Sequence, residues 1–337
     1  MKSHSENIIG HATTLLTALE QASRLAPINR PVLIIGERGT GKELLAERIH
    51  FLSGRWDKPL LKVNCGAISD DLMESELYGH EPGAFTGASR VHHGRFERAD
   101  GGTLFMDEVG TMSLRLQEKL LRLIEYGEFE RLGGQQPMQA DVRVVAATNS
   151  DLKEMAGRGQ FRLDLLDRLN FDVIHVPPLR YRREDIPELV QHFAVQMCRD
   201  LGWEYFPGFT QGALQTLLNY SWPGNIRELK NVIERSVYRW AEPTRAVAAV
   251  IIDPFLSPFE NTEVKESKHL EKAPAEEKES TTDFTEQTEA FALQLLQSTL
   301  QKYHNHQGRT AKALGLTYHQ LRGLLRKHDL IGKLSTK

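Results

Sequence analysis

A glycine-rich segment near the start of the sequence is the strongest candidate for chemistry. It follows a short aliphatic run, Val32–Ile35, which predicts a buried strand. The spacing of Leu45, Ile49 and Leu52 after it predicts an amphipathic helix. Glycines in such a turn let backbone N–H groups converge on phosphate oxygens at the helix N-terminus. The predicted phosphate loop consists of Gly36, Glu37, Arg38, Gly39, Thr40, Gly41, Lys42 and Glu43.

Two residues of this loop indicate how it would bind a nucleotide. Lys42 stands where an ammonium group reaches the β- and γ-phosphates. Glu43 stands where other phosphate loops carry a serine or threonine that binds Mg²⁺, so metal coordination must use other groups and water. A glycine turn without a ligand is the alternative, but the lysine and the strand, loop and helix context favour a phosphate site.

Two consecutive carboxylates, Asp107 and Glu108, follow a second apolar run at residues 103–106. An aspartate at the end of a buried strand is placed to hold Mg²⁺, and the glutamate beside it is placed to orient and deprotonate an attacking water. A solvated acidic turn is the alternative for this pair taken alone. Together with the phosphate loop, the pair predicts nucleotide hydrolysis.

A small apolar loop lies between the two motifs and is flanked by charged residues. A phenylalanine between glycines at the surface is unfavourable without a partner, so the loop predicts a contact with another molecule rather than a plain surface turn. The loop consists of Gly83, Ala84, Phe85, Thr86, Gly87 and Ala88.

These motifs together resemble a known family, the AAA+ bacterial enhancer-binding proteins that activate transcription by sigma-54 RNA polymerase. Residues 83–88 reproduce the GAFTGA loop of that family, and Glu43 is also the residue that the family has after its phosphate-loop lysine. The resemblance covers residues 7–240. It implies ATP and Mg²⁺ as cofactors, a homo-oligomeric ring, expected to be a hexamer, and a GAFTGA loop that contacts sigma-54.

The resemblance also implies roles for residues around the nucleotide. Asn64 is similar to the switch residue that hydrogen-bonds the catalytic glutamate, here Glu108, although an asparagine can also simply end a strand. Thr148 and Asn149 are similar to the sensor I pair. Arg227 resembles the sensor II arginine of a helical lid.

Arg162 and Arg168 resemble the arginine-finger pair of the family, which acts on the nucleotide of a neighbouring subunit. If both lie on one helix, their separation of six residues turns the second side chain about 240° around the helix axis from the first. The two side chains should then point in different directions and have different roles. We expect Arg168 to be the finger and Arg162 to be partly interfacial. A pair of surface arginines in salt bridges is the alternative.

Trp56 lies in a polar stretch, where a tryptophan is either half-packed or a docking site. No sensory domain fits before residue 36, so control is expected to arrive from another protein. The chain is similar to the phage shock members of the family, which implies upstream activating DNA at phage shock operons. It also implies the negative regulator phage shock protein A as the partner at Trp56. Residues 126–137 form a flexible hairpin candidate that in the family supports the GAFTGA loop.

The C-terminal segment concentrates positive charge. Residues 301–337 carry a charge of +7, although the whole chain has a formal charge of −3. A short helix, a glycine turn and a cationic helix with Thr317 and Gln320 as a capping box predict a helix-turn-helix of the Fis type. The alternative is a solvated basic helix. The predicted DNA-contacting residues are Thr317, Tyr318, His319, Gln320, Arg322, Arg326 and Lys327.

The elements that position these motifs follow from the hydrophobic pattern. Apolar runs at 32–35, 60–63, 103–106 and 142–147 alternate with helical patterns, which predicts an α/β fold with a parallel sheet. The predicted domains are an AAA+ α/β nucleotide-binding subdomain at 1–180, a helical lid at 181–254, a flexible linker at 255–288 and a DNA-binding domain at 289–337. The linker has nine acidic residues and four lysines.

Composition narrows the class of protein further. Hydrophobic residues make up 40% and charged residues 26%, as in ordinary globular proteins. The sequence shows no apolar run long enough for a membrane helix and no signal peptide, so we expect a cytoplasmic protein without membrane insertion. Cys65 and Cys198 are expected to be buried, inert thiols. Two other functions stay open at this point: a DNA-binding regulator that uses the ATPase fold only for assembly, and another AAA+ remodeller such as an unfoldase or helicase.

Overall fold

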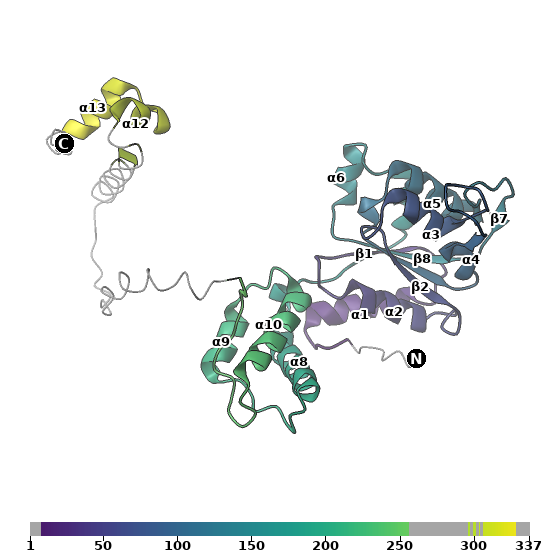
Figure 1. The fold of residues 1–337 in the computed structure, drawn as a ribbon, viewed down its shortest axis with the longest axis horizontal. Coiled ribbons are helices and arrows are strands. Elements are labelled where there is room, and N and C mark those ends of the chain that lie inside the picture. Colours follow the sequence, from purple (N-terminus) through teal and green to yellow (C-terminus); the bar gives the residue numbers. More distant parts are fainter. Residues whose placement is uncertain (1–7, 256–295, 297–298, 301–302, 304–305, 328–337) are drawn as a thin grey trace. The chain divides into compact units, whose positions relative to one another are not determined.

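The computed structural model describes residues 8–255, 296, 299, 300, 303 and 306–327. The chain divides into two compact units, Met1–Phe255 and Leu256–Lys337, which are considered separately (Figure 1). Apart from Phe255, the predicted linker lies outside the described residues.

A five-stranded parallel sheet forms the centre of the first unit, with the strand order β2-β5-β8-β1-β9. The strands are β1 (Val32–Ile35), β2 (Leu60–Asn64), β5 (Thr103–Asp107), β8 (Arg143–Thr148) and β9 (Val173–His175). The four predicted strands are confirmed, each to within one residue at either end. The fifth, β9, has only three residues and no distinct apolar run, so the sequence did not reveal it.

Helices cover both faces of the sheet (Figure 1). The helices are α1 (Thr13–Leu25), α2 (Lys42–Phe51), α3 (Asp70–Tyr78), α4 (Arg95–Arg98), α5 (Leu114–Tyr126), α6 (Leu152–Gly157) and α7 (Leu163–Leu169). Successive residues of a strand point to opposite faces. Accordingly, Val32 and Ile34 of β1 pack with α1 and α2, whereas Leu33 packs with the cluster formed by α3 to α7.

Two short hairpins extend from the α3 to α5 layer. Strands β3 (Gly79–His80) and β4 (His92–His93) pair antiparallel, and so do β6 (Glu128–Phe129) and β7 (Met138–Gln139). A hairpin is therefore present where one was predicted, but its second strand lies just beyond the predicted range of 126–137. The first hairpin contains the GAFTGA loop.

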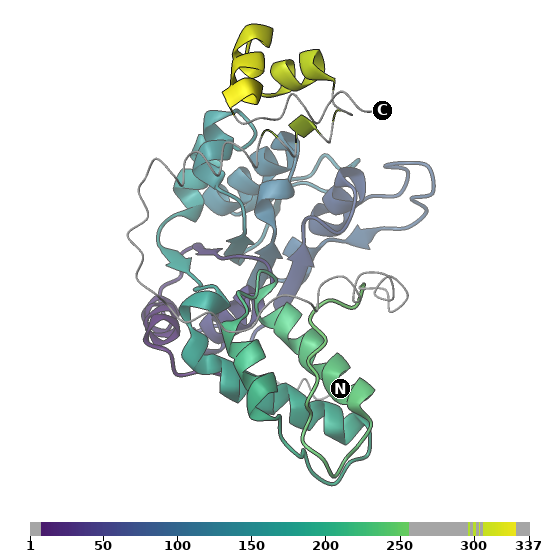
Figure 2. The same cartoon turned by 90° about the vertical axis from the view of Figure 1, so that its left-hand side faces the viewer.

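The helical lid follows β9. It consists of η2 (Leu179–Tyr181), η3 (Arg183–Asp185), α8 (Ile186–Asp200), α9 (Gln211–Asn219) and α10 (Asn225–Trp240). The lid helices lie together below the sheet in Figure 2. They surround a separate hydrophobic cluster that includes the fully buried Trp222. The chain after α10 also packs here, since Val247 is buried and forms a bridge with Phe209.

The second unit contains α12 (Gln307–Ala313) and α13 (Tyr318–Lys327), joined by a turn in which Gly315 has a φ of +66°. Leu321 and Leu325 of α13 pack with Ala311 of α12 and with Leu296 and Leu300. The predicted capping box is confirmed. The backbone N–H of Thr317 donates to Gln320 Oε1 at 2.9 Å, and the N–H of Gln320 donates to Thr317 Oγ1 at 3.3 Å.

Candidate nucleotide site

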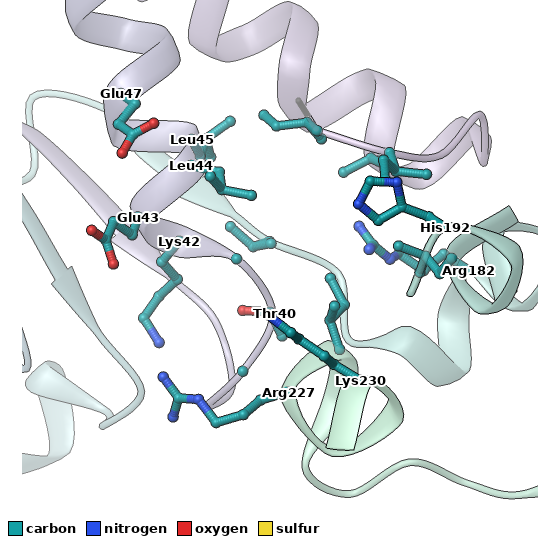
Figure 3. Close-up of a pocket in the computed structure, with 18 of the residues that line it drawn as sticks. Thr40, Lys42, Glu43, Leu44, Leu45, Glu47, Arg182, His192, Arg227 and Lys230 are labelled. Atoms are coloured by element: carbon teal, nitrogen blue, oxygen red, sulfur yellow. The ribbon is translucent and has the colours of Figure 1, made fainter. Parts of the chain in front are cut away.

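A cavity of about 780 Å³ lies at the carboxyl ends of the central strands, between the phosphate loop and the lid. At one end, the side chains of Lys42 and Arg227 point toward one another, from the phosphate loop and from α10 (Figure 3). Two cations that converge in this way favour an anionic ligand. The other part of the wall is more apolar and is lined by Ile8, Ile9, Leu15, Leu189 and Phe193.

The phosphate loop has the backbone that its glycines predict. Gly39 and Gly41 have φ values of +80° and +95°, and α2 begins directly afterwards at Lys42. The Lys42 ammonium donates to the backbone oxygens of Gly36 at 3.0 Å and Glu37 at 3.3 Å. Burial lowers the pKa of Lys42, and the nearby carboxylates of Asp107 and Glu108 oppose this shift.

Asp107 and Glu108 lie at the end of β5, beside Asn64 at the end of β2, and Asn64 is in register with Asp107. Burial raises the pKa of Asp107, while Lys42 opposes this change. Glu108 has a φ of +56°, which is uncommon for a residue with a side chain. Its carboxylate lies against Gly66, where a Cβ would overlap with Glu108 Oε2.

Asn64 hydrogen-bonds to the chain beside Glu108 rather than to Glu108 itself, the partner implied for a switch residue. Its side-chain oxygen accepts a hydrogen bond from the N–H of Gly66 at 2.8 Å. The amide and the Glu108 carboxylate are thus both next to Gly66. Cys65 is buried between the two strand ends, and burial raises the pKa of its thiol to about 12, in line with the inert thiol expected there.

Glu43 is engaged by a lysine that sequence reasoning missed. Lys62 of β2 donates to Glu43 Oε1 at 2.8 Å and also to Glu47 Oε1. All three residues line the cavity. Lys62 occupies an ordinary polar position of a strand, so its sequence context gave no signal of this role.

Of the two sensor positions, Thr148 lies beside the phosphate loop. Thr148 ends β8, is buried, and its carbonyl accepts a hydrogen bond from the N–H of Gly36 at 3.1 Å. Asn149 follows it at the surface. Arg227 is in the first turn of α10 and contacts Gly39, where a Cβ would lie 3.0 Å from Arg227 Cβ.

Arg162 and Arg168 lie outside this cavity. Arg162 pairs with Asp164, with Nη2 and Oδ2 2.8 Å apart, and Arg168 Nε donates to Glu125 Oε1 at 2.7 Å. Helix α7 begins at Leu163, so the rotation expected for two residues of one helix does not apply to Arg162. The two arginines nevertheless have different partners.

The GAFTGA loop is held at its base by the second hairpin. The N–H of Gly83 donates to the Ala88 oxygen at 2.7 Å, which closes the loop, and Arg131 Nη1 pairs with Glu81 at 2.7 Å. A Cβ at Gly133 would lie 2.9 Å from Ala84 Cβ, so the hairpins touch. The Phe85 side chain is 44% exposed although its ring lies 4.9 Å from that of His80.

Two other predicted contact sites are at the surface. Trp56 is 65% exposed, more than expected for a half-packed side chain. In the second unit, five predicted DNA-contacting side chains of α13 are exposed, and the side chain of Lys327 lies outside the described residues. The five are Tyr318, His319, Gln320, Arg322 and Arg326.

In the part of the chain that the structure describes, no helix has the length and apolar character to cross a membrane. The model of the Sigma-54 interaction domain matches residues 8–175, and that of the AAA+ ATPase lid domain matches residues 180–268. Together the two domains account for most of the first unit.

Known proteins resemble the chain over different lengths. It is 54% identical to the Psp operon transcriptional activator of Escherichia coli (strain K12) over 98% of this chain and 100% of that protein. It is 49% identical to the Nif-specific regulatory protein of Azotobacter vinelandii, over 68% of this chain but only 44% of that protein.

A solved structure of NtrX from Brucella abortus in complex with ATP superposes with a TM-score of 0.68 at 32% identity, over 95% of this chain and 69% of that one. The domain matches, the full-length relative and the cavity at the phosphate loop agree. The chain therefore belongs to the AAA+ family of sigma-54-dependent transcription activators, binds ATP and hydrolyses it to act on sigma-54 RNA polymerase.

Proposed function

We propose that the chain activates phage shock operons from upstream DNA, as a hexameric ring in the cytoplasm that moves its GAFTGA loop against sigma-54. The observation that carries this proposal is the position of residues 83–88. They form a closed loop with an exposed Phe85. The loop lies on the hairpin that directly follows α3, and α3 in turn follows β2, which ends at the switch candidate Asn64. The target operons follow from the likeness to the Psp operon activator.

In this proposal each predicted residue in or near the cavity has a separate task. Lys42 and Arg227 hold the phosphates. Mg²⁺, which fits a half-buried carboxylate beside phosphate oxygens, would be held by Asp107 and would neutralise phosphate charge. Glu108 accepts the proton of the attacking water. Thr148, Asn149 and Asn64 respond to the γ-phosphate, and the change reaches α3 through the chain that follows β2.

The ring supplies the last group of the site. Arg168, with Arg162 beside the interface, would reach the nucleotide of the neighbouring subunit and stabilise charge on the transferring phosphoryl group. Both arginine side chains are accessible to solvent, and their ion pairs are with carboxylates of the same subunit. The arginines can therefore leave these carboxylates for the nucleotide of a neighbouring subunit at a small free-energy cost.

Two further contacts complete the proposal. Exposed residues of α13, with Thr317 and Gln320 at its start, read the DNA, with Arg326 and Lys327 on phosphates. Trp56 is the contact of phage shock protein A, because a tryptophan with 65% of its surface exposed offers an apolar docking point.

The central claim can be tested by mixing the full chain with sigma-54 and ADP–aluminium fluoride, a mimic of the hydrolysis transition state. We expect a complex that forms with this mimic, is absent with ADP alone, and is lost in Thr86→Ala while hydrolysis continues. A chain that hydrolyses ATP but forms no nucleotide-dependent complex would contradict the proposal. Function that persists in Thr86→Ala would instead favour a remodeller that does not use this loop.

A second measurement separates the reader from the motor. Deletion of residues 290–337 should abolish binding to a specific DNA fragment and leave ATP hydrolysis within about twofold of the full chain, because the first unit has its own hydrophobic clusters. Loss of hydrolysis in the truncated chain would contradict the separation of the two units.

A further inference from the structure

Glu37, the second residue of the phosphate loop, is held by two residues from elsewhere in the chain. Its carboxylate accepts hydrogen bonds from Arg180 Nη1 at 2.8 Å and Nη2 at 2.5 Å. It also accepts one from Asn225 Nδ2 at 3.1 Å. Arg180 lies in η2, directly after the sheet, and Asn225 begins α10. We call Glu37, Arg180 and Asn225 the lid clasp.

Asn225 is the buried member of the clasp. It is fully buried and has a φ of +53°, a conformation that asparagine tolerates better than most residues. Its oxygen accepts from the N–H of Leu179 at 2.8 Å, and its nitrogen donates to the Arg38 oxygen at 3.0 Å as well as to Glu37. A buried amide with this many partners fixes the start of α10, because a displaced helix would leave them unpaired.

The backbone of α10 lies directly on the phosphate loop at the same place. The N–H of Ile226 donates to the Gly39 oxygen at 3.0 Å. Gly39 has no space for a side chain because the Gly224 oxygen and Arg227 Cβ lie against it. Arg227, only two residues after Asn225, therefore takes its position from these contacts.

The ion pair of the clasp fixes the orientation of Arg180 relative to Glu37 more than it stabilises the fold. The Arg180 and Glu37 side chains are 37% and 40% exposed, so their ion pair contributes little to the free energy of folding. The hydrogen bonds of Arg180 and Asn225 lower the pKa of Glu37, because they stabilise its ionised form. A two-pronged guanidinium–carboxylate contact fixes direction as well as distance.

We propose that the lid clasp is a positioning device for hydrolysis: Arg180 and Asn225 hold the start of α10 against the phosphate loop so that Arg227 lies over the phosphates. This inference rests on the proposed role of Arg227 as the lid residue that contacts nucleotide. Neither Arg180 nor Asn225 touches the nucleotide in this scheme. They act through Glu37 and Arg227.

The first test compares Arg180→Ala and Arg180→Lys with a matched control, Arg183→Ala, an exposed arginine three residues further on. In the full chain we expect kcat/KM for ATP to fall about tenfold or more in Arg180→Ala, because small misplacements of a contacting group have large effects on rate. Arg180→Lys keeps the charge but not the two-pronged contact and should restore only part of the rate. Arg183→Ala should resemble the original chain. Thermal melting of all three variants shows whether they remain folded. A loss of kcat/KM in Arg183→Ala as large as that in Arg180→Ala would overturn the proposal.

The second test asks whether Arg180 acts through Arg227. Arg180→Ala is combined with Arg227→Ala, and kcat/KM is measured for the four chains of the cycle. If the clasp positions Arg227, then Arg180→Ala should lower kcat/KM by less than about threefold in a chain that already carries Arg227→Ala. Equal losses from Arg180→Ala in both backgrounds would overturn the inference.

The cycle also separates this inference from the role of Arg227. If Arg227→Ala leaves hydrolysis and nucleotide affinity unchanged, the proposed role of Arg227 fails, and an effect of Arg180→Ala then has another origin. If Arg227→Ala is impaired but Arg180→Ala is not, the role of Arg227 stands and the clasp is overturned.

Discussion

At the phosphate end of the cavity, Lys42 is buried and Asp107 is half-buried. Arg162 and Arg168, in contrast, lie at the surface in ion pairs with exposed or partly exposed carboxylates. Burial lowers the pKa of Lys42 and raises that of Asp107, so each is shifted toward its neutral form. Lys42, which is buried, is fixed by helix α2, and Asp107, which is half-buried, is fixed by the end of β5. Among the described residues, the side chains of the surface arginines are held only by ion pairs, Arg162 with Asp164 and Glu118 and Arg168 with Glu125.

This difference indicates which groups serve the subunit's own nucleotide and which can serve a neighbour's. Charges in a low-dielectric cavity interact strongly and require a rigid position. Surface ion pairs are worth about 0 to 1 kcal/mol, so their members can change partners when another subunit approaches. The following experiments test this contrast.

Replacement of Arg168 by alanine should have the largest effect. We expect kcat for ATP hydrolysis to fall about 10³-fold or more while nucleotide affinity changes little, because an arginine finger acts on the transition state. Steady-state hydrolysis and titration with a fluorescent nucleotide measure the two quantities. Arg158→Ala, at another surface pair with Glu154, is the control and should have little effect.

A mixture of variants shows whether this arginine acts between subunits. Arg168→Ala and Glu108→Gln are each expected to lose most of their activity, but a site made from Glu108 of one subunit and Arg168 of its neighbour would be complete. Mixing the two chains should therefore restore part of the activity. No recovery on mixing would place Arg168 in the site of its own subunit.

Glu108→Gln tests the buried side of the comparison. Loss of a general base lowers rates by about 10²- to 10⁴-fold. We expect kcat to fall in this range and ATP affinity to persist, because Lys42 and the loop glycines are unchanged. A Glu108→Gln chain that hydrolyses ATP normally would show that another group activates the water.

Lys62→Ala should have an intermediate effect. Removal of this lysine leaves Glu43 and Glu47 unpaired beside the phosphate end of the cavity. Their charges repel ATP, so we expect KM to rise about tenfold, or about 1.4 kcal/mol. The second substitution Glu43→Gln should reverse part of the rise. Lys58→Ala, whose ammonium lies 3.7 Å from Asp57, is the control.

Glu125→Ala should have the smallest effect. It removes the surface partner of Arg168. For a pair worth up to about 1 kcal/mol, we expect a melting temperature lower by no more than about 4 °C and a kcat within about threefold. A collapse of stability in this variant would show that the surface arginine is fixed as firmly as the buried charges.

Much of the nucleotide site was predictable because its residues are adjacent in the chain. A glycine-rich turn, the lysine after it and two acids after an apolar run each occupy a few consecutive positions, and parallel strands place such ends at one edge of a sheet. The capping box of α13 was predictable for the same reason. The short strand β9 and the start of α7 after Arg162 were not, because a three-residue strand that ends in a histidine, or a single helix boundary, gives little local signal.

The sequence by itself determined the class of chemistry: a phosphate loop, an acidic strand end, a GAFTGA loop and a basic C-terminal segment. Only the tertiary structure decided which distant residues complete them. Lys62 meets Glu43 across 19 positions, and Arg180 meets Glu37 across 143. Contacts of this kind depend on how strands and helices pack, and a single polar residue in a strand or turn has no local pattern that marks its partner.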